Sequence, residues 1–154
     1  MAQTKPMEWY GGNAPGVPGM RSNATVETVR SFAAEDGVEA GVPVVRGTAP
    51  DKQVKAAAAS GVPVGVTVWD PAGDEEGDAY YPDGSAVPVM TEGDIWVTAG
   101  GDVAAGDAVA YDTSAGGFTK GTESTASGNM FLTAGAKGDI VEIHIQNPAL
   151  IVVS

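Results

Sequence analysis

Carboxylates are the residues of this chain whose number and spacing most readily suggest chemistry. Residues 70–84 read DPAGDEEGDAYYPDG and contain Asp70, Asp74, Glu75, Glu76, Asp78 and Asp83. Ca²⁺ requires several oxygen ligands, but the EF-hand loop has alternating acids, then a glycine and a distant glutamate, and this spacing departs from it. Residues 70–112 contain eleven acidic and no basic side chains. A solvated acidic loop is therefore the favoured interpretation, with binding of a metal or of a host surface as the alternatives.

Other chemistry-bearing residues are scarce. His144 is the only histidine and the chain has no cysteine, which excludes a disulfide scaffold, a thiol nucleophile and a cysteine-based zinc site. A hydrolytic triad or a histidine-based zinc site would need partners for His144 that its strand periodicity cannot place. Residues 116–121 (GGFTKG) lack the Gly-Lys-Ser/Thr ending of a phosphate-binding loop. We therefore predict no catalytic residue, no cofactor and no metal, and we expect the protein not to be an enzyme.

The charge distribution excludes further classes of partner. The formal net charge of the 154-residue chain is −12, with eight basic side chains in all, whereas a phosphate-binding surface needs clustered Lys and Arg. Residues 1–34 carry three basic and two acidic side chains, and the remainder carries five basic and eighteen acidic ones. No apolar run is long enough for a transmembrane helix, and the N-terminus has no signal-peptide core. We expect neither nucleic acid nor a membrane as a partner.

The elements that must position these side chains are short strands. From residue 24 onward apolar residues recur with period two, and the 22 glycines and 10 prolines punctuate them without a regular repeat. The predicted strands cover residues 25–32, 38–46, 62–69, 87–90, 94–98, 107–112, 129–133, 139–146 and 150–153, with another near Phe118 and a turn at residues 92–93. Residues 51–59 are ambiguous between helix and strand, and we favour a short strand and loop. The expected fold is all-β, a single small β-barrel or β-sandwich over residues 24–154.

The inward faces of the clearest strands define the expected core. It consists of Val64, Val66, Val68, Ile95, Val97, Val109, Val141, Ile143 and Ile145. His144 lies on the opposite, polar face of its strand, beside Glu142, and is expected at the surface or in an interface.

Residues 1–23 have the composition of an extended arm. Repeated Gly and Pro oppose both a long helix and a regular strand, yet the segment retains large apolar side chains that a simple flexible tail would lack. We predict that the arm docks on a partner; the alternative is that it folds back on its own domain. The expected contact residues are Met7, Trp9, Tyr10, Val17, Met20 and Arg21.

An ordered series of short segments resembles a known family. Residues 38–48 (VEAGVPVVRGT) are followed by 51–55 (DKQVK), 64–67 (VGVT), 87–97 (VPVMTEGDIWV), 103–111 (VAAGDAVAY) and 140–143 (IVEI). The series is similar to the structural cement, or head decoration, proteins of tailed bacteriophages, in the family's order. The resemblance implies a non-enzymatic viral structural protein, made in the bacterial host, that binds the exterior of the capsid and stabilises it by bridging major capsid protein subunits.

The resemblance also implies self-association, and one other function stays open. Decoration proteins of this kind usually occupy symmetry axes, so a homo-oligomer is expected, with a trimer preferred over a dimer. The alternative function is a carbohydrate-binding β-module that recognises host or surface glycans, because such a module would also explain this fold class and the Trp and Tyr content.

Overall fold

The structure, a computed structural model, describes residues 17–22, 26–59, 61–70, 80–122 and 127–154, and the statements below refer to these. It is nearly all β. The strands are β1 (Thr28–Ala34), β2 (Val38–Glu39), β3 (Pro43–Arg46), β4 (Gln53–Ala56), β5 (Gly65–Thr67), β6 (Tyr80–Tyr81), β7 (Ala86–Thr98), β8 (Val109–Asp112), β9 (Gly117–Lys120), β10 (Met130–Phe131), β11 (Ile140–Ile145) and β12 (Val152–Val153). A 3₁₀ turn, η3 (Pro148–Leu150), precedes the last strand.

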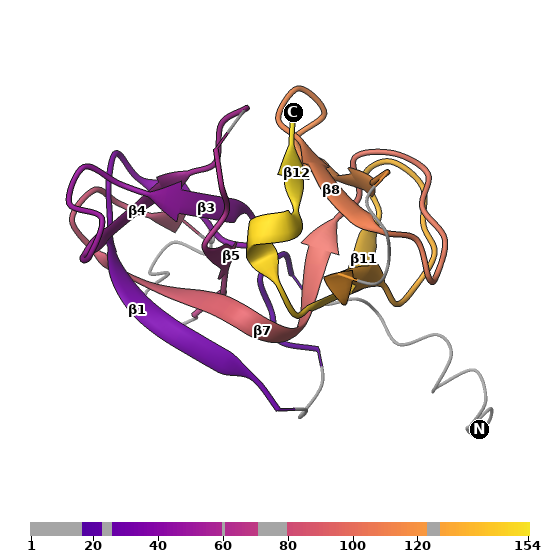
Figure 1. Cartoon of the computed structure of the whole chain (residues 1–154), viewed down its shortest axis with the longest axis horizontal. Coiled ribbons are helices and arrows are strands. Elements are labelled where there is room, and N and C mark those ends of the chain that lie inside the picture. Colours follow the sequence, from indigo (N-terminus) through magenta and orange to yellow (C-terminus); the bar gives the residue numbers. More distant parts are fainter. Residues whose placement is uncertain (1–16, 23–25, 60, 71–79, 123–126) are drawn as a thin grey trace, which may run out of the picture.

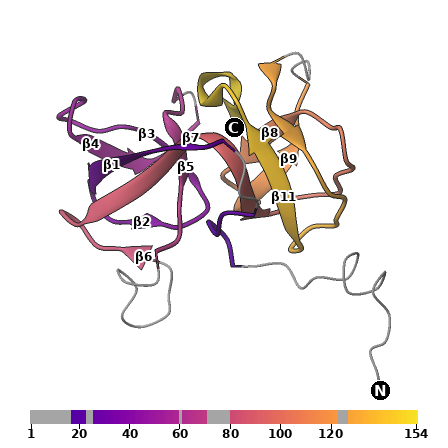
Figure 2. The same ribbon diagram turned by 90° about the horizontal axis from the view of Figure 1, so that it is seen from below.

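Five strands close into a small barrel. The hydrogen-bonded order β1-β4-β3-β5-β7 returns to its start because β7 also pairs with β1. Closure leaves these strands no free edge, which a chain with short strands otherwise has to protect. The two-stranded pair of β2 and β6 lies below the barrel in Figure 2. The prediction of an all-β barrel or sandwich is confirmed, and the barrel is the form that this part of the chain adopts.

The long strand β7 joins the barrel to a second lobe (Figure 1). Its first half pairs with β1 and β5, and its second half pairs with β11 from Gly93 to Thr98. Between the halves, Thr28 pairs with Glu92 while Val29 pairs with Met90, so Thr91 is an extra residue, a β-bulge. A bulge reverses which face successive side chains occupy and bends the strand. One strand therefore supplies core residues to both lobes.

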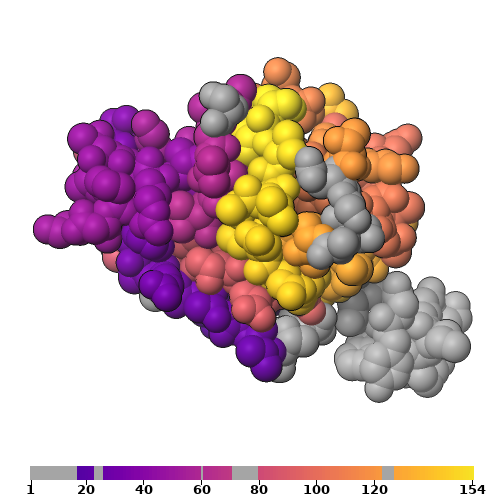
Figure 3. All heavy atoms as spheres, in the orientation of Figure 1, coloured from indigo at the N-terminus to yellow at the C-terminus, as the bar shows by residue number. Residues whose placement is uncertain are grey.

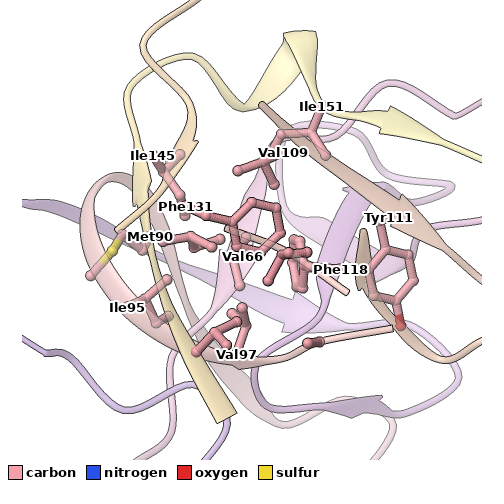
Figure 4. Packing of buried hydrophobic residues seen from close by; sticks show 14 of the residues in the cluster. Val66, Met90, Ile95, Val97, Val109, Tyr111, Phe118, Phe131, Ile145 and Ile151 are labelled. Atoms are coloured by element: carbon pink, nitrogen blue, oxygen red, sulfur yellow. The ribbon is translucent and has the colours of Figure 1, made fainter. Parts of the chain in front are cut away.

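The two lobes have separate hydrophobic cores. Within the barrel, Val44, Val54, Val87 and Val89 are fully buried against Tyr81 and their neighbours. The second core is larger. In it, Phe118, Phe131 and the apolar face of β11 pack against Val66 and Met90, two barrel residues whose side chains point outward from the barrel (Figure 4). The ring of Phe118 meets that of Tyr111 edge-on at a centroid distance of 4.9 Å, a favourable arrangement for aromatic pairs. The second lobe thus packs on the outer surface of the barrel.

Eight of the nine expected core residues are confirmed. Val66, Val68, Ile95, Val97, Val109, Val141, Ile143 and Ile145 are all buried. The prediction for Val64 is wrong, because this residue is only half-buried. It precedes β5, beyond the part of the barrel that the second lobe covers, and it lines a surface groove instead.

Several strand boundaries differ from the expectation. The turn expected at residues 92–93 is wrong, because these residues lie inside β7 and Gly93 adopts a φ of +135° within the strand. The strand expected over residues 38–46 is interrupted, because Gly41 turns the chain with a φ of +77° between β2 and β3. Residues 70–84 are not wholly a loop: Tyr80 and Tyr81 form β6. Tyr81 is buried, and its hydroxyl donates a hydrogen bond to the carbonyl of Val68.

A buried asparagine fixes the turn that leads from β11 to η3. Asn129 is only 1% exposed. Its side-chain oxygen accepts hydrogen bonds from the backbone N–H groups of Gln146 and Asn147, each at 2.9 Å. Its Nδ2 donates to the carbonyl of Asn147 at 2.6 Å. This one side chain therefore satisfies three backbone groups of the turn.

We expect Asn129→Ala to lower the free energy of unfolding by about 2–4 kcal/mol, because each buried polar group left unsatisfied costs about 1–3 kcal/mol and water replaces part of the loss. Urea-induced unfolding measures the change. Asn147→Ala is the matched control, because the Asn147 side chain makes no capping hydrogen bond, and its effect should stay within about 0.5 kcal/mol. Equal losses in the two variants would contradict this role for Asn129.

Candidate functional site

The described end of the arm, residues 17–22, lies against the chain's own second lobe. Pro18 and Gly19 form a tight turn, closed by a hydrogen bond from the Met20 N–H to the Val17 carbonyl at 3.0 Å. Residues 19–22 then run antiparallel to β7. The Gly19 N–H donates to the Trp96 carbonyl at 2.8 Å, and the Trp96 N–H donates to the Met20 carbonyl at 2.9 Å. This segment, which we call the arm root, covers the edge of β7 that β11 leaves open.

The expected contact residues of the arm therefore divide into two groups. Met7, Trp9 and Tyr10 lie outside the described residues. In the arm root, Val17 is 39% exposed and Met20 is half-buried, while Arg21 forms an ion pair with Glu27 at 3.2 Å. The arm root makes intramolecular contacts, and contact of Val17, Met20 and Arg21 with a partner stays a prediction.

Two glycines allow the arm root to lie this close to the barrel. Gly19 has a φ of +91°, and a Cβ there would approach the backbone nitrogens of Gly41 and Trp69 to 2.8 Å. Gly41 has a φ of +77°, and its own Cβ would meet Gly19 and Pro18 at 2.7 Å. Both the positive φ and the close backbone contact require glycine.

We expect Gly19→Ala to detach the arm root. The left-handed backbone costs a non-glycine residue about 1–2 kcal/mol, and the clash adds to it. The amides of Trp69 and Trp96 donate to this segment, so their hydrogen exchange should become faster. Gly106→Ala is the control, because Gly106 has a φ of +93° and nothing lies within 4 Å of its Cβ position. Unchanged protection of both amides in Gly19→Ala would contradict the expectation.

A surface groove of about 890 Å³ lies where the two lobes meet. Arg30 and Phe32 of β1 and Arg46 of β3 contribute from the barrel, Val62 from the loop before β5, and Pro148 from η3. Figure 3 shows the C-terminal segment, in yellow, crossing the molecule between the lobes on one face. We call this feature the interlobe groove.

The interlobe groove carries positive charge on an acidic molecule. Arg30 and Arg46 line it together with one acidic residue, Asp51. The Arg46 guanidinium lies over the Phe32 ring, 5.9 Å from its centroid, and donates a hydrogen bond to the Pro50 carbonyl at 2.6 Å. Among the described residues, neither arginine forms an ion pair with a carboxylate. Two guanidiniums thus share an apolar-walled groove.

Hydrogen bonds from Thr48 hold the pKa of Glu35 below its usual value. The Thr48 N–H lies 3.2 Å from both carboxylate oxygens of Glu35. This contact pins the turn between β3 and β4, which presents Asp51 to the groove. Because the folded pKa is the lower one, the contribution of this contact is present near neutral pH and is lost as pH falls through the folded pKa.

His144 lies on the less buried face of β11 and has a carboxylate partner there. It is directly opposite Asp94 in the β11–β7 pair, and its Nδ1 lies 2.6 Å from Asp94 Oδ1. The His144 side chain is about one-third exposed, at 33%, whereas that of Asp94 is 8% exposed. Sequence periodicity could not reveal this partner, because the pairing depends on the register of two distant strands.

The acidic segment is described only at its ends. Asp74, Glu75, Glu76 and Asp78 lie outside the described residues, and Asp70 and Asp83 are exposed. Within the described part of the chain, no three His, Asp or Glu side chains are grouped as metal ligands. The same part contains no helix that is long and apolar enough to cross a membrane.

Solved structures share this architecture. A structure described as the capsid of Myoviridae phage XM1 aligns with a TM-score of 0.68 and 18% identity, covering 89% of this chain and 93% of the other. The N base of the head fiber gp8.5 of bacteriophage phi29 aligns with a TM-score of 0.55 and 17% identity, covering 79% of this chain and 95% of the other. At these identities the likeness establishes the fold. The class is an all-β protein that shares its fold with these two phage structures.

The family model described as "Structural cement protein (E217 gp24/Pam3 gp6)" matches residues 8–146. The chain therefore belongs to the phage structural cement protein family, as its ordered segments indicated, and it is a structural protein of the virion capsid. No curated protein matches it significantly.

Proposed function

We propose that the protein binds the outer surface of the capsid and stabilises it by bridging neighbouring major capsid protein subunits, without catalysis. The observation that carries the proposal is the extent of the family match, which runs from residue 8 in the arm through both lobes. A bridging protein needs separate contact surfaces, and an arm together with a two-lobed body provides them.

Mass action supplies the physical mechanism. A ligand that binds the assembled lattice and not the dissociated subunits stabilises the lattice by RT ln(1 + [L]/Kd), about 2.7 kcal/mol per site at a hundredfold excess over Kd. Repeated over a shell, this stabilisation opposes the outward pressure of packaged DNA. No chemical step is required of the bound protein.

The proposal includes self-association on the particle, with a trimer preferred over a dimer. Leu150 and Val152, 43% and 46% exposed respectively, place apolar surface near the C-terminal edge strand β12, which favours burial in a further contact. The preference for a trimer depends on the resemblance to decoration proteins on symmetry axes. A particle map in which the copies do not touch would contradict self-association.

The test is reconstitution on capsids assembled from the major capsid protein encoded with this chain. Adding the purified protein should decorate expanded shells externally and raise their melting temperature, and a cryo-electron map should show each copy contacting two capsid subunits. Density confined to the inside of the shell or to the tail would contradict the proposal. Glycan-array binding with no capsid binding would favour the carbohydrate-binding alternative.

A further inference from the structure

We propose that the interlobe groove binds an extended, acidic segment of the major capsid protein, with an apolar side chain of that segment packed between Val62 and Pro148. This inference depends on the proposed function, because it names the chemistry of one contact with the capsid. The groove would be a second attachment surface, separate from the arm.

The charge of the groove selects an acidic occupant. Acidic residues outnumber basic ones by 20 to 8 in the chain, yet Arg30 and Arg46 both line the groove without a carboxylate partner among the described residues. Arginine binds carboxylates through paired, charge-assisted hydrogen bonds. The Arg46 guanidinium is also held in place by the Pro50 carbonyl and the Phe32 ring, so less of its freedom is lost on binding.

The apolar surface around the groove indicates a chain segment in place of a small molecule. Val62, which lines the groove, is 67% exposed, and Phe32 and Pro148 add further apolar surface to the lining. Apolar surface rimmed by charged and polar residues marks an interaction site. An acidic peptide with an apolar side chain can contact both the arginines and this apolar wall, whereas a small anion contacts only the arginines.

The capsid protein is a better occupant than a second copy of this chain. Each copy carries a formal net charge of −12, so two copies repel each other as they approach. The proposed self-association offsets that repulsion by burying the exposed apolar surface of Leu150 and Val152. These two residues do not line the groove, so the groove is left for a different partner. A segment that projects from the capsid lattice reaches the groove without bringing a second acidic body close to it.

The test measures binding of full-length variants to the reconstituted capsids. Arg30→Glu should weaken binding at least about tenfold and reduce its salt dependence, because rim charges act mainly through electrostatic steering and local pairing. Val62→Asp should weaken it similarly. Both residues are exposed, so circular dichroism should show folded variants. Lys137→Glu makes the same charge reversal at an exposed residue that does not line the groove and should bind like the parent protein.

The outcomes separate this inference from the proposed function. A map with a capsid segment in the groove, together with weakened binding of both groove variants, supports the inference. Capsid binding that is strong in the parent and unchanged in both groove variants overturns the inference and leaves the proposed function standing, and so does a map with a second copy in the groove. No capsid binding by the parent protein overturns the proposed function, and the inference with it.

Discussion

Ile143→Ala is expected to lower the free energy of unfolding by about 2–5 kcal/mol. Ile143 is fully buried at the centre of β11, where it is paired with Ile95 of β7 on one side and Phe131 of β10 on the other. Removing its outer carbons loses burial energy and leaves a cavity that the surrounding strands close only partly. A domain of this size is stable by about 5–15 kcal/mol, so the variant should unfold at a clearly lower urea concentration.

Ile140→Ala is the matched control for that substitution. Ile140 begins the same strand but is only half-buried, so the same change should cost less than half as much. Chemical denaturation followed by tryptophan fluorescence measures both losses. If Ile140→Ala proved as destabilising as Ile143→Ala, the buried face of β11 would be assigned wrongly.

The success of the core prediction has a physical reason. Residues 140–145 alternate strictly between buried and half-buried positions, because one face of β11 packs on the second lobe's core and the other does not. When one face of a strand is buried and the other is not, apolar and polar residues alternate along its sequence, so the buried face can be predicted from the sequence. Val64 continues the alternation of Val66 and Val68, but no local pattern shows where the covering lobe ends.

The course of β7 could not be read from its own residues. Glu92 and Gly93 have the composition of a turn, yet the chain continues through them because β1 and β11 hold the backbone on either side of the bulge at Thr91. The bulge exists only relative to its partner strand. The interlobe groove could not be predicted for a similar reason. Arg30 and Pro148 are far apart in the sequence, and only the pairing of the strands and the packing of the two lobes bring them to the same surface.

The arm is the segment from which we expect the largest effect on capsid binding. Truncation of residues 1–16 should weaken binding at least about a hundredfold while the body stays folded. This boundary keeps residues 17–22, whose hydrogen bonds complete the edge of β7 and hold the Trp69 amide. The sequence alone suggests a longer deletion, to residue 23. That deletion would also remove these hydrogen bonds, so a loss of capsid binding could then result from partial unfolding.

Trp9 and Tyr10 are the expected anchors within the arm. Ordering each residue of a segment rich in Gly and Pro costs about 1–2 kcal/mol of backbone entropy, and contacts made by its few large side chains have to offset that cost. Trp and Tyr bury much area with few rotatable bonds, which is why alanine substitution at such positions often costs 2 kcal/mol or more, about thirtyfold in affinity. Trp9→Ala alone should therefore weaken capsid binding by about ten- to a hundredfold.

The sparse charge of the arm supports this role. Before residue 17 its only charged side chains are Lys5 and Glu8, so the arm can approach an acidic neighbour without electrostatic repulsion. Sedimentation with capsids at several protein concentrations gives the affinities, and Gln3→Ala, a polar substitution in the same segment, should leave them unchanged. If the truncated protein decorates capsids as tightly as the full chain, attachment depends on the two-lobed body alone, and the interlobe groove becomes the first surface to test.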